Sequence, residues 1–227
     1  SRGSEPPAPQ VDRIGAGAAG LAIAPDVAGG ALPLPGRALG RTGHVAGLFS
    51  LGGQASIEQA GKHDVSIAII NRAIDLGVNY IDTAAAYGRP RDATRQRWEL
   101  DGISQTFVGE VMATRRKEVF LASKTDDRTR DGSLRLLEQS LKLLKTDHLD
   151  LWQLHNIARD EQLDQIFGKD GAIEALIQAR DQKMVRFLGI TGHFDPAVLA
   201  RGIARFDFDT ILMALNAADT HRLSFQQ

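Results

Sequence analysis

The sequence of 227 residues contains no cysteine, which excludes disulfide bonds and thiolate chemistry. Any metal site would therefore depend on histidines and carboxylates. An excess of charge is also lacking, with 27 basic and 28 acidic residues, so the charge balance does not favour a nucleic-acid partner. No apolar run is long enough to span a bilayer, and we expect no membrane segment. The hydrophobic content of 43% is enough for one sizeable buried core.

The first forty residues differ in composition from the rest, which predicts two regions. Residues 1–40 are interpreted as a flexible or signal-like arm, and residues 41–227 as the folded domain. The weakly apolar segment IGAGAAGLAIAP leaves two interpretations open: a degenerate Tat-like export signal without twin arginines, or the loose arm of a cytoplasmic protein, which we favour. GAGAAG at 15–20 has the GxGxxG spacing of dinucleotide-binding turns, but no convincing strand precedes it. We interpret the match as a result of the Gly/Ala-rich composition and not as a phosphate-binding loop.

From residue 45 onward, apolar runs of strand length alternate with amphipathic segments of helical period. The predicted strands are 45–53, 78–83, 119–125, 149–156, 185–193 and 210–219. The predicted helices are 66–77, 104–115, 133–144, 172–184 and 196–206, and Gly77 is expected to end the first. Such a repeat is typical of an α/β fold with a parallel sheet, either an open doubly wound sheet or a closed (β/α)8 barrel.

Polar side chains follow the predicted strands where each of them ends. Because the carboxyl ends of parallel strands share one face, these residues are expected to converge despite their distance in sequence. Each alone has a structural explanation as a cap, a solvated charge or a loop residue. Four of them together, on consecutive strands, predict a catalytic rim: Asp82, Tyr87, Lys124 and His155. Thr191 and His193 lie at the end of the next strand.

The chemistry of four of these residues is coherent. A phenol such as Tyr87 is a poor acid at neutral pH unless a nearby cation stabilises the phenolate, and Lys124 is suited to be that cation. Asp82 would hold the charge of Lys124, and His155 would donate a hydrogen bond to a substrate oxygen. A metal-dependent hydrolase or lyase that uses Asp82, His155 and His193 stays a weaker alternative, because no HxH or HExxH spacing occurs, and we predict no metal.

The blocks NYIDTAAAYG, FLASKT, LDLWQLHN and VRFLGITGH resemble the corresponding blocks of the aldo-keto reductases. The resemblance covers roughly residues 37–227 and implies a (β/α)8 TIM barrel, of which about six β/α units are present in this sequence. It implies a catalytic tetrad of Asp82, Tyr87, Lys124 and His155, in which Tyr87 is the general acid.

The resemblance also implies an activity and its partners. We expect an NAD(P)H-dependent oxidoreductase that reduces a small-molecule aldehyde or ketone with NADPH or, in its place, NADH. A non-catalytic NADP(H)-binding accessory or sensor barrel is the alternative. The cofactor contacts that the resemblance implies are Gly53, Asp82, Asn156, Thr191, Gly192 and Asn216.

Several positions depart from the pattern of the family. The usual Ser-Asn pair after the fifth strand is Thr191-Gly192, Leu212 stands where Gln is frequent, and Gln105 replaces a usual Glu. The seventh and eighth strands of the barrel are not in this sequence, from which we expect a longer parent chain. If they were truly absent, the exposed sheet edges would favour association into oligomers or aggregates.

Overall fold

The computed structural model describes residues 34–88 and 102–215. Six parallel strands follow one another in the sheet in chain order, β3-β4-β5-β6-β7-β8. Their bounds are Leu51–Gly52, Tyr80–Asp82, Phe120–Thr125, Leu149–Leu154, Val185–Gly192 and Thr210–Met213. A doubly wound sheet would reverse its strand order, whereas this order is that of a (β/α)8 barrel with six of its strands present. The predicted fold class is confirmed.

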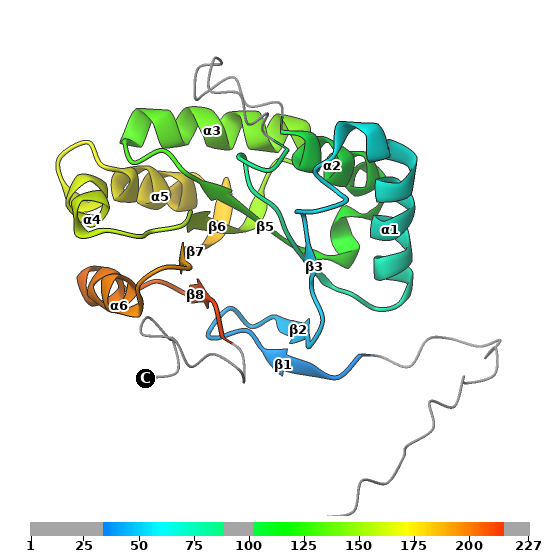
Figure 1. The fold of residues 1–227 in the computed structure, drawn as a ribbon, viewed down its shortest axis with the longest axis horizontal. Helices are drawn as coiled ribbons and strands as arrows, with labels where there is room; N and C mark the ends of the chain where they lie inside the picture. The colour runs from blue at the N-terminus through cyan, green and yellow to red at the C-terminus, as the bar shows by residue number, and fades with distance from the viewer. Residues whose placement is uncertain (1–33, 89–101, 216–227) are drawn as a thin grey trace, which may run out of the picture. The chain divides into compact units, whose positions relative to one another are not determined.

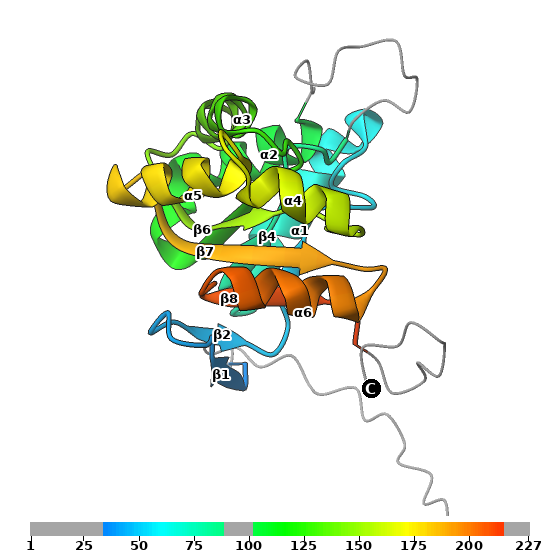
Figure 2. The same cartoon turned by 90° about the vertical axis from the view of Figure 1, so that its left-hand side faces the viewer.

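The helices lie around the outside of the curved sheet, with α1, α2 and α3 over its first strands (Figure 1). The α-helices α1 to α6 comprise His63–Asp75, Ile103–Arg115, Arg130–Leu143, Asp160–Phe167, Ala172–Asp181 and Pro196–Arg205, and two short 3₁₀ helices comprise Ala60–Lys62 and Arg116–Glu118. Figure 2 shows α6 alongside β7 and β8. None of the helices in the described ranges is both long and apolar enough to cross a membrane.

Strand alternation divides the core into two layers. Outward-facing residues such as Leu121 and Trp152 are fully buried against the helices. Inward-facing Phe120, Ala122 and Leu151 form a smaller cluster inside the curve of the sheet. Since side chains repeat with a period of two along a strand, Lys124 of β5 lies on the same inner side as Ala122. The sheet therefore directs a lysine toward its concave face.

Two details of the prediction are wrong. The segment 45–53 is not one strand: β2 (Val45–Gly47) pairs antiparallel with β1 (Gly36–Ala38), and β3 begins only at Leu51. The side chain of Asn79 holds this hairpin, since it accepts from the amide of Gly47 and donates to the carbonyl of Val45. Helix α4 was not predicted, because eight residues are too few for a clear helical period. Gly77, with φ +91°, ends α1 as expected.

Candidate active site

Three consecutive strands carry the predicted tetrad. Asp82 is the last residue of β4, Lys124 lies near the end of β5, and His155 follows the last residue of β6. In the register of the sheet Asp82 is opposite Ala122, and Lys124 is opposite Gln153. Parallel pairing thus brings side chains from three strands to one end of the sheet.

Lys124 is the centre of the site. Its side chain is 1% exposed and forms an ion pair with Asp82, whose side chain is 15% exposed. The same ammonium group donates to the carbonyl of Thr83 at 2.9 Å and to the hydroxyl of Tyr87 at 3.1 Å. It also lies 4.7 Å from the centroid of the Tyr87 ring. A buried ammonium held by a carboxylate therefore contacts a phenol, as the sequence predicts.

The loop after β4 returns Tyr87 over Lys124. Ala84 and Ala85 are buried, and the amide of Ala85 donates to the carbonyl of Lys124 at 3.4 Å. The amide of Tyr87 then donates to the carbonyl of Ala84 at 3.1 Å, which closes a turn. Gly88 has φ +87°, a conformation that glycine adopts without strain. The small residues let the loop lie close to β5.

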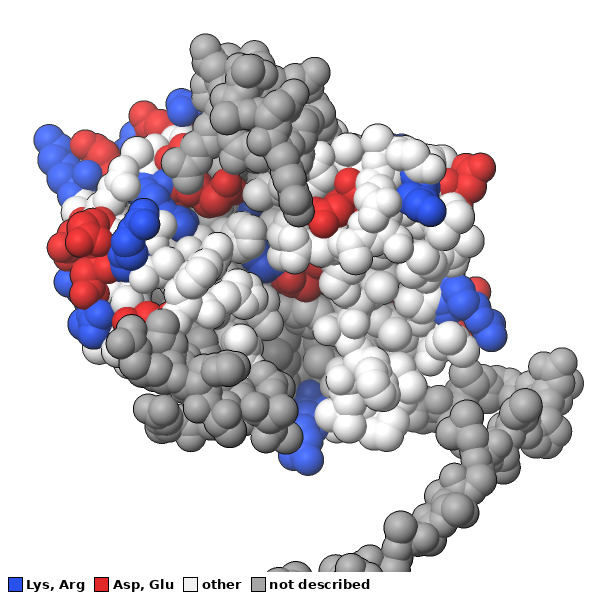
Figure 3. Space-filling view, in the orientation of Figure 1, with Lys and Arg blue, Asp and Glu red and all other residues white. Residues whose placement is uncertain are grey.

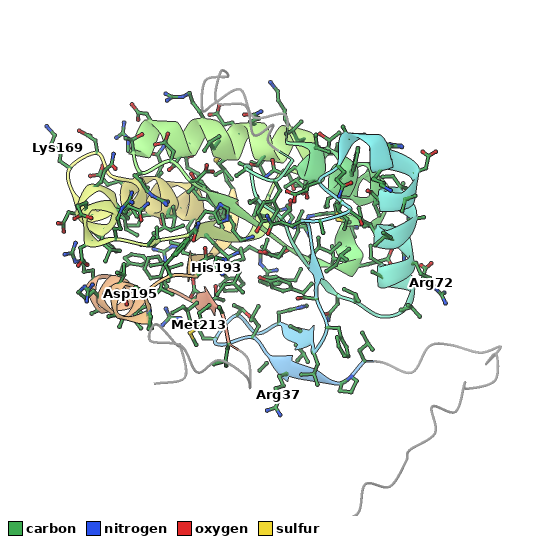
Figure 4. All side chains as sticks on the ribbon, viewed as in Figure 1. Arg37, Arg72, Lys169, His193, Asp195 and Met213 are labelled. Atoms are coloured by element: carbon green, nitrogen blue, oxygen red, sulfur yellow. The ribbon has the colours of Figure 1, made fainter. Side chains whose placement is uncertain are left out.

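His155 completes the group of four. Its ring meets the Tyr87 ring edge-on, with 5.6 Å between the centroids. Burial, with the positive charges of Lys124 and Arg128 and the neighbouring His193, lowers the pKa of His155 to about 3. His155 is therefore a neutral imidazole at physiological pH. His193, which directly follows β7 and is labelled in Figure 4, is exposed.

The predicted cofactor contacts fall into two places. The amide of Asn156, a residue with φ +54°, donates to the Thr191 hydroxyl at 2.8 Å, so these two residues lie together beside His155. A Cβ at Gly192 would lie 2.7 Å from the carbonyl oxygen of Ile157, so this backbone has no room for the asparagine that is usual in the family. These residues occupy the ends of β6 and β7.

Gly53 lies on the other side, next to β4. Its amide donates to the carbonyl of Asp82 at 2.8 Å. A side chain there would meet the hydroxyls of Ser104 and Thr83 at 2.5 and 3.0 Å, so the glycine permits the close approach of α2. Asn216 lies outside the described residues. Leu212, in β8, is 38% exposed.

Sequence reasoning missed one buried polar residue at the site. Gln153 is 1% exposed, and its amide nitrogen donates to Asp82 at 3.0 Å. The signal was its place two residues before His155, on the same face of the strand. Gln105, by contrast, is buried away from the site, where it donates to Ser123 and Ser140.

The rest of the described chain is relevant to two alternatives, a metal site and a surface of one charge. No group of three histidine or acidic residues there could hold a metal ion. On the face seen in Figure 3, basic and acidic side chains are interspersed around α4 and α5. The tetrad therefore stays the strongest candidate site.

Comparison with known proteins agrees with this geometry. The model of the aldo/keto reductase family matches residues 45–208. The uncharacterized oxidoreductase YqkF of Bacillus subtilis is 28% identical over 166 residues, which cover 68% of this chain and 48% of that protein. The chain spans about half the length of the curated relatives it matches.

Two solved structures share the fold at 24% identity. An aldo-keto reductase from Bacillus halodurans, in its holo form, aligns with a TM-score of 0.65 over 80% of this chain and 58% of that one. An aldo-keto reductase from Klebsiella pneumoniae, solved in complex with NADPH, aligns with a TM-score of 0.57 over 72% and 51%. The fold and the resemblance that the sequence predicts are thereby confirmed.

Proposed function

Because the chain belongs to the aldo/keto reductase family, we propose that the protein reduces the carbonyl group of an aldehyde or a ketone with NADPH, or with NADH in its place. One observation carries the proposal: Lys124 is paired with Asp82 and lies 3.1 Å from the hydroxyl of Tyr87. The NADPH complex of the Klebsiella pneumoniae reductase, which has a similar fold, supports the choice of cofactor.

In this proposal Tyr87 donates the proton that the carbonyl oxygen takes up. The ammonium group of Lys124 stabilises the phenolate that remains, and the carboxylate of Asp82 keeps the charge on Lys124. His155 donates a hydrogen bond from its neutral ring to the same oxygen and so orients the substrate. Because the pKa of His155 is lowered to about 3, its ring carries no extra proton and does not replace Tyr87 as the acid.

The residues beside His155 fit the nicotinamide end of the cofactor. The Oδ1 atom of Asn156 is buried and has no hydrogen-bond partner in the described part of the chain. A carboxamide could donate to this atom, and the hydroxyl of Thr191 accepts from the main-chain amide of the same asparagine. Asn156 and Thr191 would thus hold the ring. A bound NADPH supplies the hydride.

The test is a variant that removes the phenolic proton of Tyr87 and keeps its aromatic ring. In Tyr87→Phe, we expect folding and cofactor binding to survive while carbonyl reduction falls roughly a hundredfold or more, the scale of a lost general acid. Steady-state turnover is measured on simple aldehydes and quinones, with thermal melts in parallel. Cofactor binding is followed by tryptophan fluorescence.

Tyr80→Phe is the matched control, because it removes the other phenol of the chain. Tyr80 lies two residues before Asp82 on β4, and it should keep turnover near that of the wild type. Normal turnover in a folded Tyr87→Phe variant would refute the mechanism. A wild type that binds NADPH without reducing any carbonyl compound would favour the accessory or sensor alternative.

A further inference from the structure

Gln153 is a buried amide that the proposed mechanism does not use. It lies on β6, opposite Lys124 in the register of the sheet, and its Nε2 atom donates to Oδ1 of Asp82. We propose that Gln153 is a positioning residue, which acts through Asp82 to keep the proton of Lys124 next to Tyr87. This inference rests on the proposed function of the site.

The two oxygens of the Asp82 carboxylate have different partners. Oδ2 is paired with the ammonium of Lys124, and Oδ1 accepts from Gln153 at 3.0 Å. Because the partners stand on different strands, β5 and β6, rotation of the carboxylate would break both contacts at once. Gln153 therefore fixes the plane of the carboxylate in the orientation that pairs with Lys124.

A second observation concerns the space that Gln153 occupies. On the other side of β6, Gly189 of β7 is its register partner. A Cβ at Gly189 would lie 2.9 Å from Cγ of Gln153 and 2.5 Å from the hydroxyl of Thr210. The glycine leaves the room through which the glutamine side chain passes. Gly189 thus gives the stem of Gln153 its space, and Asp82 accepts from its amide.

The amide is suited to this role because it is neutral. Hydrogen bonds to a carboxylate favour its charged form, and a neutral donor does so without competing with Lys124 for the negative charge. Without Gln153, one oxygen of a largely buried carboxylate would have no donor, and the proton of Lys124 would pass more readily to Asp82. The pair would then be neutral, and Tyr87 would lose the cation that stabilises its phenolate.

Direct titration of Tyr87 tests this effect without any turnover. The chain has two tyrosines, so in a Tyr80→Phe background only Tyr87 contributes to the near-ultraviolet phenolate absorbance. The charged and titratable groups around it are Asp82 of β4, Lys124 of β5 and His155 after β6. Arg128 and His193 lie beyond His155, and Glu58 accepts from the amide of Gly88. These groups stay the same in wild type and Gln153→Met.

We expect Gln153→Met to shift the titration midpoint of Tyr87 to higher pH by about one unit, a tenfold change, which is the low end for a hydrogen bond to a charged group. Lys124→Met should shift it further in the same direction. Gln105→Met, which removes another buried amide, should leave it unchanged. Coincident titrations of wild type and Gln153→Met, with a shift in Lys124→Met, would overturn the proposal. Gln153→Asn, which is too short to reach Asp82, gives the same test if the methionine variant fails to fold.

Turnover gives a second readout, in which a carboxylic acid replaces the amide. Gln153→Glu donates to Asp82 only when protonated, so its activity should recover as the pH is lowered, whereas Gln153→Met should stay about tenfold below wild type throughout. A glutamate variant that follows the methionine variant at every pH would contradict the role of the donor. A wild type without reductase activity would refute the proposed function, while the Tyr87 titration would still decide the role of Gln153.

Discussion

Replacement of His155 by glutamine should remove part of the acid sensitivity of the fold. In the folded protein the pKa of His155 is lowered from 6.5 to about 3, first by burial and then by the positive charges of Lys124 and Arg128. The unfolded chain binds a proton at this residue below its ordinary pKa, and the folded chain does not until about pH 3. The stabilising contribution is therefore complete above pH 6.5 and is lost as the pH falls through the range from 6.5 toward 3.

The size of the effect follows from this difference. A difference of one pKa unit corresponds to about 1.36 kcal/mol, and about pH 5 lies roughly 1.5 units below the pKa of His155 in the unfolded chain. The free energy of unfolding should therefore fall by about 2 kcal/mol between about pH 8 and about pH 5 through this residue. Urea unfolding of wild type and His155→Gln at both pH values measures it. On acidification, the free energy of unfolding of the variant should fall by about 2 kcal/mol less than that of the wild type.

A second histidine provides the control. His63 is exposed, and its hydrogen bonds to Asp64 and Glu110 raise its pKa, so it stabilises the fold at low pH rather than at high pH. His63→Gln should therefore not reduce the loss of stability on acidification. Equal losses in wild type and His155→Gln would show that His155 takes up a proton as readily in the folded chain as in the unfolded one, and would refute the reasoning.

Two further substitutions test the site and the helix packing. Lys124→Met should lower turnover strongly while cofactor affinity stays within a few-fold, and a parallel collapse of cofactor binding would instead make Lys124 a binding residue. Gly109→Ala places a Cβ 1.9 Å from the carbonyl oxygen of Leu143, so it should destabilise the fold by about 3 kcal/mol or more, as measured by urea unfolding. Gly61→Ala, where no atom lies within 4 Å, is its neutral control.

The strands that are buried on both sides could be predicted from their apolar runs. The segments FLASKT and LDLWQL are buried at every position, and their residues at 120–122, 149, 151, 152 and 154 supply the apolar signal. Because the carboxyl ends of parallel strands share one face, the order of the strands was enough to predict that Asp82, Lys124 and His155 lie close together. These parts follow from one-dimensional patterns.

Features that depend on contacts between distant segments could not be predicted in the same way. The hairpin of β1 and β2 has short strands with exposed residues. The apolar residues of β2 and β3 therefore look like one run in the sequence, and the two strands were predicted as one. The contact of Gln153 depends on which strands become neighbours and in which register. The lack of room for a side chain at Gly192 depends on the carbonyl of Ile157. Neither relation leaves a local pattern in the sequence.

The order of the strands has an evolutionary consequence. Each strand of the sheet pairs with its neighbours in sequence, so the contacts among Asp82, Tyr87, Lys124 and Gln153 all arise within one uninterrupted stretch of chain. Recombination that exchanges the segments before or after this stretch leaves those contacts on the same parental copy. Natural variants could thus acquire new loops around the mouth of the sheet by segment exchange, while a single inherited block keeps the proton-donating group intact.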